Sequence, residues 1–176
     1  MDAKKAVQKF IGPNWVVSII FLIPPLTVIG IFMLLFVTLP TMFRAKKTVS
    51  RLEDKGELIK AANEMASAKA KHLIKGKAIF GENYVFCKNN GYIFNYDEIK
   101  WAYRHRFTQS VLFIPIKVTD SLYLAAANMS PRAVVSMGKD KTDEIKNAIL
   151  EIYSHNDKCL IGYTKENIAA YKAMPK

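Results

Sequence analysis

Apolar residues are concentrated in one segment near the N-terminus rather than spread evenly along the chain. No charged residue occurs between Lys9 and Arg44. Within the segment 15–39, the only polar side chains are three hydroxyls, and the remaining residues are apolar apart from one glycine and the pair Pro24-Pro25. At about 1.5 Å per residue, a helix of this length spans roughly 37 Å, more than the ~30 Å hydrocarbon core of a bilayer. The pattern therefore predicts a transmembrane segment over residues 15–39.

Two alternatives to a simple span follow from the same segment. A cleaved signal peptide fits less well, because its apolar region runs about 7–15 residues and ends in small residues, whereas this one ends in large side chains at Met42 and Phe43. The Pro24-Pro25 pair favours a kinked span, since a membrane helix tolerates proline when the freed carbonyls find other partners. A re-entrant hairpin with halves 15–23 and 26–39 is the other arrangement.

Basic residues on both flanks predict the orientation of this segment. The short basic N-terminus, residues 1–14, carries three lysines, and six basic residues follow the segment by position 60. The positive-inside rule then places the rest of the chain in the cytoplasm. The sequence thus predicts a single-pass cell-membrane protein with membrane lipids as partners, held by a membrane-proximal basic group made of Arg44, Lys46, Lys47 and Arg51.

The spacing of apolar residues changes from helical to alternating near position 76. Residues 41–75 are typical of a juxtamembrane helical linker, interrupted at Gly56, which is a suitable helix stop. The linker either stays solvated or packs on the following domain or on a second copy, so a homo-oligomer is one prediction. Residues 76–176 form the main domain, with strands expected at 78–80, 84–88, 92–94, 99–107, 112–119, 121–127 and 133–137, and with helices at 140–154 and 166–173.

The fourth predicted strand alternates cleanly. Its apolar face, which includes Ile99 and Trp101, is expected to be buried. The opposite face presents Lys100, Arg104 and Arg106, which we interpret as a basic stripe for lipid or partner binding. A solvated face that only keeps the domain soluble is the alternative interpretation of this stripe.

Seven short strands followed by one amphipathic helix predict an α+β fold. This element order is that of a pleckstrin-homology-like (PH-like) antiparallel β-barrel closed by a C-terminal helix, placed after an N-terminal transmembrane helix and a helical linker. A two-layer α+β sandwich is the alternative architecture.

Four short motifs carry a resemblance to a known group of proteins: 52–58 (LEDKGEL), 81–86 (GENYVF), 96–103 (YDEIKWAY) and 162–163 (GY). They resemble an uncharacterised bacterial membrane-anchored family with a PH-like soluble domain. The resemblance covers roughly residues 50 to 172 and implies a membrane anchor joined to that domain. Its motifs consist of aromatic and turn residues, so they imply a fold and no activity.

The usual signatures of catalysis and of cofactor or metal binding are absent from the sequence. There is no phosphate-binding glycine-rich loop and no nucleophile elbow. Cys87 and Cys159 have no metal-ligand spacing, and His72, His105 and His155 lie far apart. Asp97 and Glu98 are adjacent, and on an extended chain they point to opposite sides, which suits paired catalysis poorly. We therefore expect no cofactor, no metal and no enzymatic activity.

The positive charge of the chain, +11 overall, lies mainly before position 76. Residues 1–75 carry twelve basic and five acidic residues, against fourteen and ten in the rest. The small excess on the main domain and the absence of a nucleic-acid motif weigh against nucleic acid as the partner. The sequence predicts a membrane-tethered, non-enzymatic module that binds a protein partner or anionic lipid headgroups. A structural subunit of a membrane complex and an enzyme with an unrecognised site are the alternatives.

Overall fold

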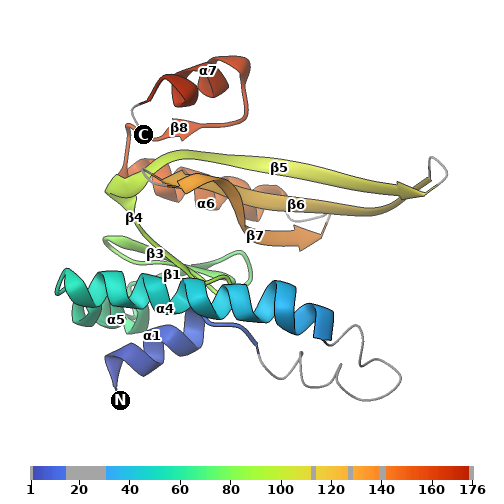
Figure 1. Ribbon diagram of the computed structural model, residues 1–176. Coiled ribbons are helices and arrows are strands. Elements are labelled where there is room, and N and C mark those ends of the chain that lie inside the picture. The colour runs from blue at the N-terminus through green and yellow to red at the C-terminus, as the bar shows by residue number, and fades with distance from the viewer. Residues whose placement is uncertain (1, 15–30, 112–113, 127–128, 139–141, 175–176) are drawn as a thin grey trace.

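The computed structural model describes residues 2–14, 31–111, 114–126, 129–138 and 142–174 (Figure 1). Its helices are α1 (Ala3–Ile11), the π-helix η1 (Leu34–Thr38), α4 (Leu39–Asp54), α5 (Leu58–Ala66), the 3-10 helix η2 (Tyr96–Glu98), α6 (Thr142–His155) and α7 (Lys165–Ala173). Its strands are β1 (Lys71–Leu73), β2 (Ala78–Phe80), β3 (Tyr84–Cys87), β4 (Tyr92–Asn95), β5 (Ile99–Val111), β6 (Ile114–Ala126), β7 (Met129–Gly138) and β8 (Leu160–Ile161). The fold class is α+β, with a sheet-rich main domain.

The described strands form two sheets of four strands each. Sheet A has the order β1-β2-β3-β4 and is an antiparallel meander, whereas sheet B has the order β7-β6-β5-β8. Strand β8 joins sheet B in parallel with β5, and the other pairs of that sheet are antiparallel. Tight turns join neighbouring strands of sheet A. The predicted Asn-Gly turn before β4 is confirmed, because Asn89 and Gly91 have the positive φ angles of 57° and 77° that such a turn needs.

Sheet A separates two hydrophobic clusters, because its residues alternate between its two faces. Phe80 and Val85 point into a central core, while Ile79 and Phe86 point toward the N-terminal helices. The central core is completed by the inner face of sheet B and by Ile145 and other apolar residues of α6. In Figure 1, α1, α4 and α5 lie on the side of sheet A away from sheet B.

The helical segment before sheet A belongs to the packed body of the protein. Buried residues of α4 and α5, among them Val49 and Ala61, pack with Ile11 of α1 and with the outer face of sheet A. Gly56, at φ 69°, separates α4 from α5 as expected from the sequence. The second half of the linker differs from expectation, because α5 ends at Ala66 and residues 71–73 form β1, paired antiparallel with β2.

A β-bulge changes the expected facing of β5. Trp101 is buried at 3% exposure and shares a cluster with Tyr103, as the alternation predicts. Ile99 points instead into the central core, because the register with β6 shifts between Ile99 and Trp101. The extra residue at the bulge is Lys100, so this lysine is out of step with the alternation of the rest of the strand.

The predicted transmembrane segment is not supported. Residues 15–30, including the Pro24-Pro25 kink or hairpin, lie outside the described residues. The helical stretch that follows is apolar only as far as Phe43, and from Arg44 onward it carries many charged residues. Within the described ranges, no helix is both long enough and apolar enough to cross a membrane. The expectation of an N-terminal transmembrane helix was therefore wrong, as was the single-pass membrane localisation that rested on it.

The predicted closed barrel is also wrong. Across the described strands, no strand of sheet A pairs with a strand of sheet B, so the two sheets do not close on each other. Helix α4 covers the free edge of β4 instead: the Thr48 hydroxyl donates to the carbonyl of Gly91, and the Arg51 guanidinium donates to the carbonyl of Ile93. Because these outward carbonyls are already satisfied by side chains, they are not free to bond another strand.

Two further expectations from the sequence concern β6 and α6. The strands expected at 112–119 and 121–127 form one continuous strand, β6, with Asp120 in its middle. The helix expected at 140–154 is confirmed as α6, although there is no barrel for it to close, and its expected N-cap, Asp140, lies outside the described residues.

Candidate functional site

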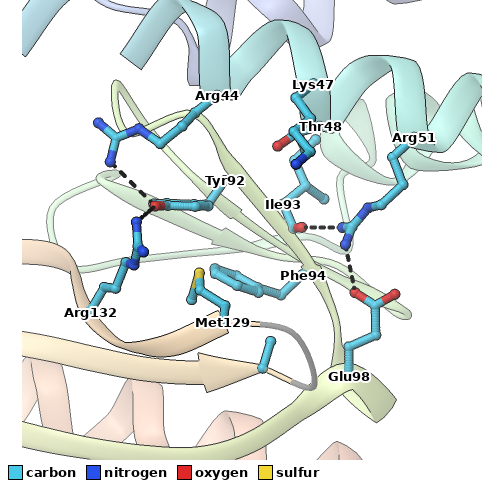
Figure 2. A pocket seen from close by; sticks show the side chains of 11 residues that line it. Arg44, Lys47, Thr48, Arg51, Tyr92, Ile93, Phe94, Glu98, Met129 and Arg132 are labelled. Atoms are coloured by element: carbon cyan, nitrogen blue, oxygen red, sulfur yellow. Dashed lines mark hydrogen bonds and ion pairs between the residues drawn. The ribbon is translucent and has the colours of Figure 1, made fainter. Parts of the chain in front are cut away.

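A cleft of about 420 Å³ lies between helix α4, strand β4 and the beginning of β7 (Figure 2). Basic side chains line part of the cleft, and aromatic and aliphatic side chains line the rest. The residues that line it are Arg44, Lys47, Thr48, Arg51, Tyr92, Ile93, Phe94, Glu98, Ala126, Met129 and Arg132. Its volume falls within the range of about 300–1,000 Å³ that is usual for ligand pockets.

Helix α4 supplies one basic wall of the cleft because of its periodicity. Arg44, Thr48 and Arg51 follow one another at spacings of four and three residues, so they lie on one stripe of the helix. The buried residues Ala45 and Val49 occupy the adjacent stripe and fix the helix against α1 and sheet A. The burial of one stripe therefore aims the other at β4 and the cleft.

Two arginines from distant parts of the chain meet at one hydroxyl group. Arg44 Nη1 donates to Tyr92 Oη at 3.3 Å, and Arg132 Nη1 donates to the same oxygen at 3.2 Å. The Arg44 guanidinium also lies 5.2 Å from the centre of the Tyr92 ring, and it donates to Thr41 Oγ1 at 2.8 Å. In Figure 2, Arg44 approaches Tyr92 from α4 and Arg132 approaches it from β7.

The opposite end of the cleft holds a carboxylate that offsets part of its positive charge. Arg51 Nη1 lies 3.3 Å from Glu98 Oε2, and Lys55 Nζ lies 3.1 Å from Glu98 Oε1. Arg51 also donates to the carbonyl oxygen of Ile93 at 3.0 Å. Glu98 is thus held by two cations, and Arg51 has both an acidic and a backbone partner.

Charge is unbalanced at the end formed by Arg44 and Arg132. No ion pair to Arg44, Lys47 or Arg132 is found among the side chains that the structure describes. The hydroxyl shared by the two guanidiniums is neutral, so it accepts their hydrogen bonds without offsetting their charge. Like charges held close together repel each other, and this end of the cleft is therefore suited to an anion.

The membrane-proximal basic group of the sequence analysis is divided by the structure. Arg44, Lys47 and Arg51 line the cleft, whereas Lys46 does not. Lys46 is exposed and borders a shallow hollow along α4 together with Asp54.

The predicted basic stripe on β5 is also divided. Arg106 makes a two-pronged pair with Asp120, with Nε to Oδ1 and Nη2 to Oδ2 both at 2.9 Å, and Arg104 Nε lies 3.7 Å from Asp120 Oδ1. Lys100 sits at the bulge, beside a separate hollow that includes Asp97 and Lys158. Arg104 and Arg106 therefore lie together, and Lys100 lies apart from them.

Sequence reasoning did not find four of the residues that define the cleft: Tyr92, Glu98, Met129 and Arg132. Tyr92 and Glu98 were interpreted as strand and turn residues, and the last two fell just before an expected strand. These four residues are connected with α4 only by their proximity in the folded structure. The spacing of residues along the sequence does not show this proximity. The cationic half on α4 was visible only as a basic group.

The cysteines and histidines of the described residues do not line the cleft. Burial raises the pKa of Cys87 and that of Cys159 to about 12, so both thiols stay protonated near neutral pH and are poor nucleophiles. The ring of His155 stacks on that of Tyr96 with 4.2 Å between the ring centres, and the ring centres of His105 and Tyr123 are 5.2 Å apart. Among the described residues, no group of histidine, cysteine and acidic side chains is arranged to hold a metal ion.

Comparisons of the chain with protein-family models, with curated proteins and with solved structures found no match.

Proposed function

We propose that this protein is a non-enzymatic interaction module that holds an anionic group of its partner in the cleft between α4, β4 and β7. The observation that supports this most strongly is the pair of guanidiniums, Arg44 and Arg132, that share the neutral hydroxyl of Tyr92. An anion placed beside that hydroxyl would accept charge-assisted hydrogen bonds from both arginines, and these are roughly twice as strong as bonds between neutral groups.

The origin of the two arginines gives such an anion a structural consequence. Arg44 belongs to α4, which packs against sheet A, and Arg132 belongs to β7 of sheet B. A bound anion would bridge the two sheets at a place where they have no strand pairing. Because a ligand that binds only the folded state stabilises it, occupancy is expected to raise the melting temperature.

The composition of the cleft favours binding over catalysis. The described residues that line it include no histidine, cysteine, serine or aspartate. The hydroxyl of Thr48 is engaged with the carbonyl of Gly91, and the Glu98 carboxylate is engaged with Arg51 and Lys55. General acid–base catalysis needs a group that is placed to exchange protons with a substrate, and the partners of Thr48 and Glu98 occupy both of these groups.

The test measures the thermal unfolding of the full chain in millimolar sulfate and in chloride at matched ionic strength. At ten times the dissociation constant, sulfate should stabilise the fold by about 1.4 kcal/mol, which corresponds to a rise of about 3–6 °C for a chain of this size. Arg44→Gln with Arg132→Gln should abolish the sulfate-specific part of the rise. Lys47→Glu should reduce it without removing a packed side chain, because Lys47 is exposed.

The matched control is Lys60→Gln with Lys172→Gln, which removes the same charge from exposed positions on α5 and α7. This variant should keep the full difference between sulfate and chloride. If the control loses the difference as fully as the cleft variant does, sulfate acts through net charge, and the proposal of a specific anion site fails.

A further inference from the structure

The cleft has an apolar wall beside its pair of guanidiniums. Phe94, Ala126 and Met129 line it, and the rings of Tyr92 and Phe94 stack with their centres 5.6 Å apart. Ala126 and Met129 are opposite each other on β6 and β7 and are only partly buried. Figure 2 shows the Met129 side chain next to the Phe94 ring. A ligand with an anionic group at Tyr92 would therefore place its neighbouring atoms against carbon.

Glu98 makes the two ends of the cleft differ in charge. Its side chain is 26% exposed at the end of the cleft opposite Arg44 and Arg132, and it forms ion pairs with Arg51 and Lys55. One carboxylate thus offsets part of the charge of two cations there, so an anionic group is attracted to that end less strongly than to Arg44 and Arg132. The cleft is thus suited to one anionic group and one apolar group, in that order along its length.

Two main-chain carbonyls at the free edge of β4 are already engaged by side chains of α4. The outward carbonyls of Gly91 and Ile93 accept from Thr48 and Arg51. Recognition by strand addition uses a row of open main-chain donors and acceptors. Recognition in this cleft therefore depends on side chains.

We infer that the cleft binds a segment of a protein partner that presents a single acidic side chain close to an aliphatic or aromatic side chain. The carboxylate lies between Arg44 and Arg132, and the apolar side chain packs on Phe94 and Met129. This inference rests on the proposed function and adds the chemical class of the partner to it.

The same features disfavour the other macromolecules that carry anions. A nucleic-acid strand has phosphates at every step, so its second charge would approach Glu98. A lipid whose headgroup bound at Arg44 and Arg132 would have its acyl chain run along the apolar wall and then meet the polar end formed by Lys47, Arg51 and Glu98. Contact between an acyl chain and these charged groups is unfavourable. A peptide supplies its own amide groups to that polar end while keeping one carboxylate and one apolar side chain for the rest of the cleft.

The experiment screens the full chain against a positional-scanning library of hexapeptides whose termini are acetylated and amidated, so that only side chains carry charge. The best ligands should contain one aspartate or glutamate within two positions of a leucine, isoleucine, methionine, phenylalanine or tyrosine. Replacing that apolar residue by serine should weaken binding about tenfold. Anisotropy of labelled peptides provides the affinities.

Protein variants show which residues read each part of the peptide. Arg44→Gln with Arg132→Gln should abolish binding, and Met129→Ser should remove the preference for an apolar residue while binding of acidic peptides persists. Met174→Ser, a partly buried methionine in a different hollow, is the control and should leave the preference intact.

The results that would contradict the inference can be distinguished from those that would contradict the proposed function. Ranking of peptides by their number of acidic residues alone would overturn the inference, while the sulfate result would still stand. Sulfate binding without any peptide binding would also overturn it, and binding to phosphatidylserine vesicles but not to phosphatidylcholine vesicles would then assign the site to a lipid headgroup. Loss of both the sulfate and the peptide effects would remove the proposed function as well.

Discussion

Arg104 and Arg106 on β5 converge on a carboxylate, whereas Arg44 and Arg132 in the cleft converge on a phenol. In the first pair, the acceptor Asp120 has a fully buried side chain, and Arg106 binds both of its oxygens at 2.9 Å. In the second pair, the acceptor is the neutral hydroxyl of Tyr92. Each region thus holds two arginines, but those on β5 share an acidic partner and those in the cleft share a neutral one.

This difference teaches that a basic residue indicates a binding site only when its counter-ion is known. The arginines on β5 offset the charge of a buried carboxylate, which is a structural role. The arginines of the cleft have no acidic partner in the part of the chain that the structure describes, so a ligand can supply one. In the sequence, the β5 arginines formed the more conspicuous pair, because they are two residues apart on one strand.

The largest expected effect is the loss of stability on removing the β5 pair. Arg106→Met keeps most of the apolar stem but leaves the buried Asp120 without its two-pronged partner. Because breaking a buried ion pair costs about 3–5 kcal/mol and Arg106 is 43% exposed, we expect a loss near 3 kcal/mol in urea unfolding. Arg104→Met, which removes a partner at 3.7 Å, should cost about 1 kcal/mol. A loss below 1 kcal/mol for Arg106→Met would show that the pair is not structural.

The second prediction converts the cleft into a copy of the β5 arrangement. Met129→Glu places a carboxylate in the lining of the cleft, which Met129 shares with Arg44 and Arg132, so that it can offset part of the charge of the two guanidiniums. Sulfate affinity should fall at least about tenfold, which is 1.4 kcal/mol, since the internal carboxylate competes with the ligand. Calorimetric titration measures the affinity.

The control for this substitution is Met129→Gln, which has the same length and no charge. It should bind sulfate as the parent chain does. Equal loss in the glutamine variant would mean that the shape of the methionine is required, and the contrast between paired and unpaired arginines would not explain binding.

The third prediction concerns the end of the cleft that already has its counter-ion. Glu98→Gln removes the negative charge opposite Arg44 and Arg132, so peptides with two acidic residues should gain about fivefold in affinity, from roughly 1 kcal/mol of relieved repulsion. Peptides with one acidic residue should change little. Glu166→Gln on the exposed start of α7 is the control, and a similar gain in this variant would indicate a general effect of net charge.

The sequence was sufficient for elements that depend on local signals. The Asn-Gly turn before β4, the helix stop at Gly56 and the amphipathic pattern of α6 each lie within a few residues. It was insufficient for β1, which was expected to be helical, because β1 exists through its pairing with β2, for example His72 with Ile79. The bulge at Lys100 likewise depends on the register with β6.

The candidate site was predictable only in part for the same reason. Arg44, Lys47 and Arg51 were identified as a basic group, because they lie close together on one helix. Arg132 and Tyr92 were not connected with them, since each lies more than forty positions away in the chain, and the meeting of the two arginines requires the packing of α4 on sheet A. The local pattern thus supplied three of the four basic residues that line the described cleft, and tertiary structure supplied the geometry.

The smallest expected effect comes from the hydroxyl that the two cleft arginines share. Tyr92→Phe keeps the ring that stacks on Phe94 and lies beneath Arg44, and it removes only the common acceptor. Both guanidiniums border the open cleft, so water can replace the lost bonds, and the stability should fall by about 0.5–1 kcal/mol. Sulfate affinity should stay within about twofold of the parent value, because the anion contacts the guanidiniums and does not need the hydroxyl. Tyr153→Phe, at an exposed position on α6, is the matched control for the loss of a phenol. A loss of sulfate affinity of tenfold or more in Tyr92→Phe, with none in the control, would show that the hydroxyl itself binds the anion, and the unpaired charge of the arginines would then be secondary.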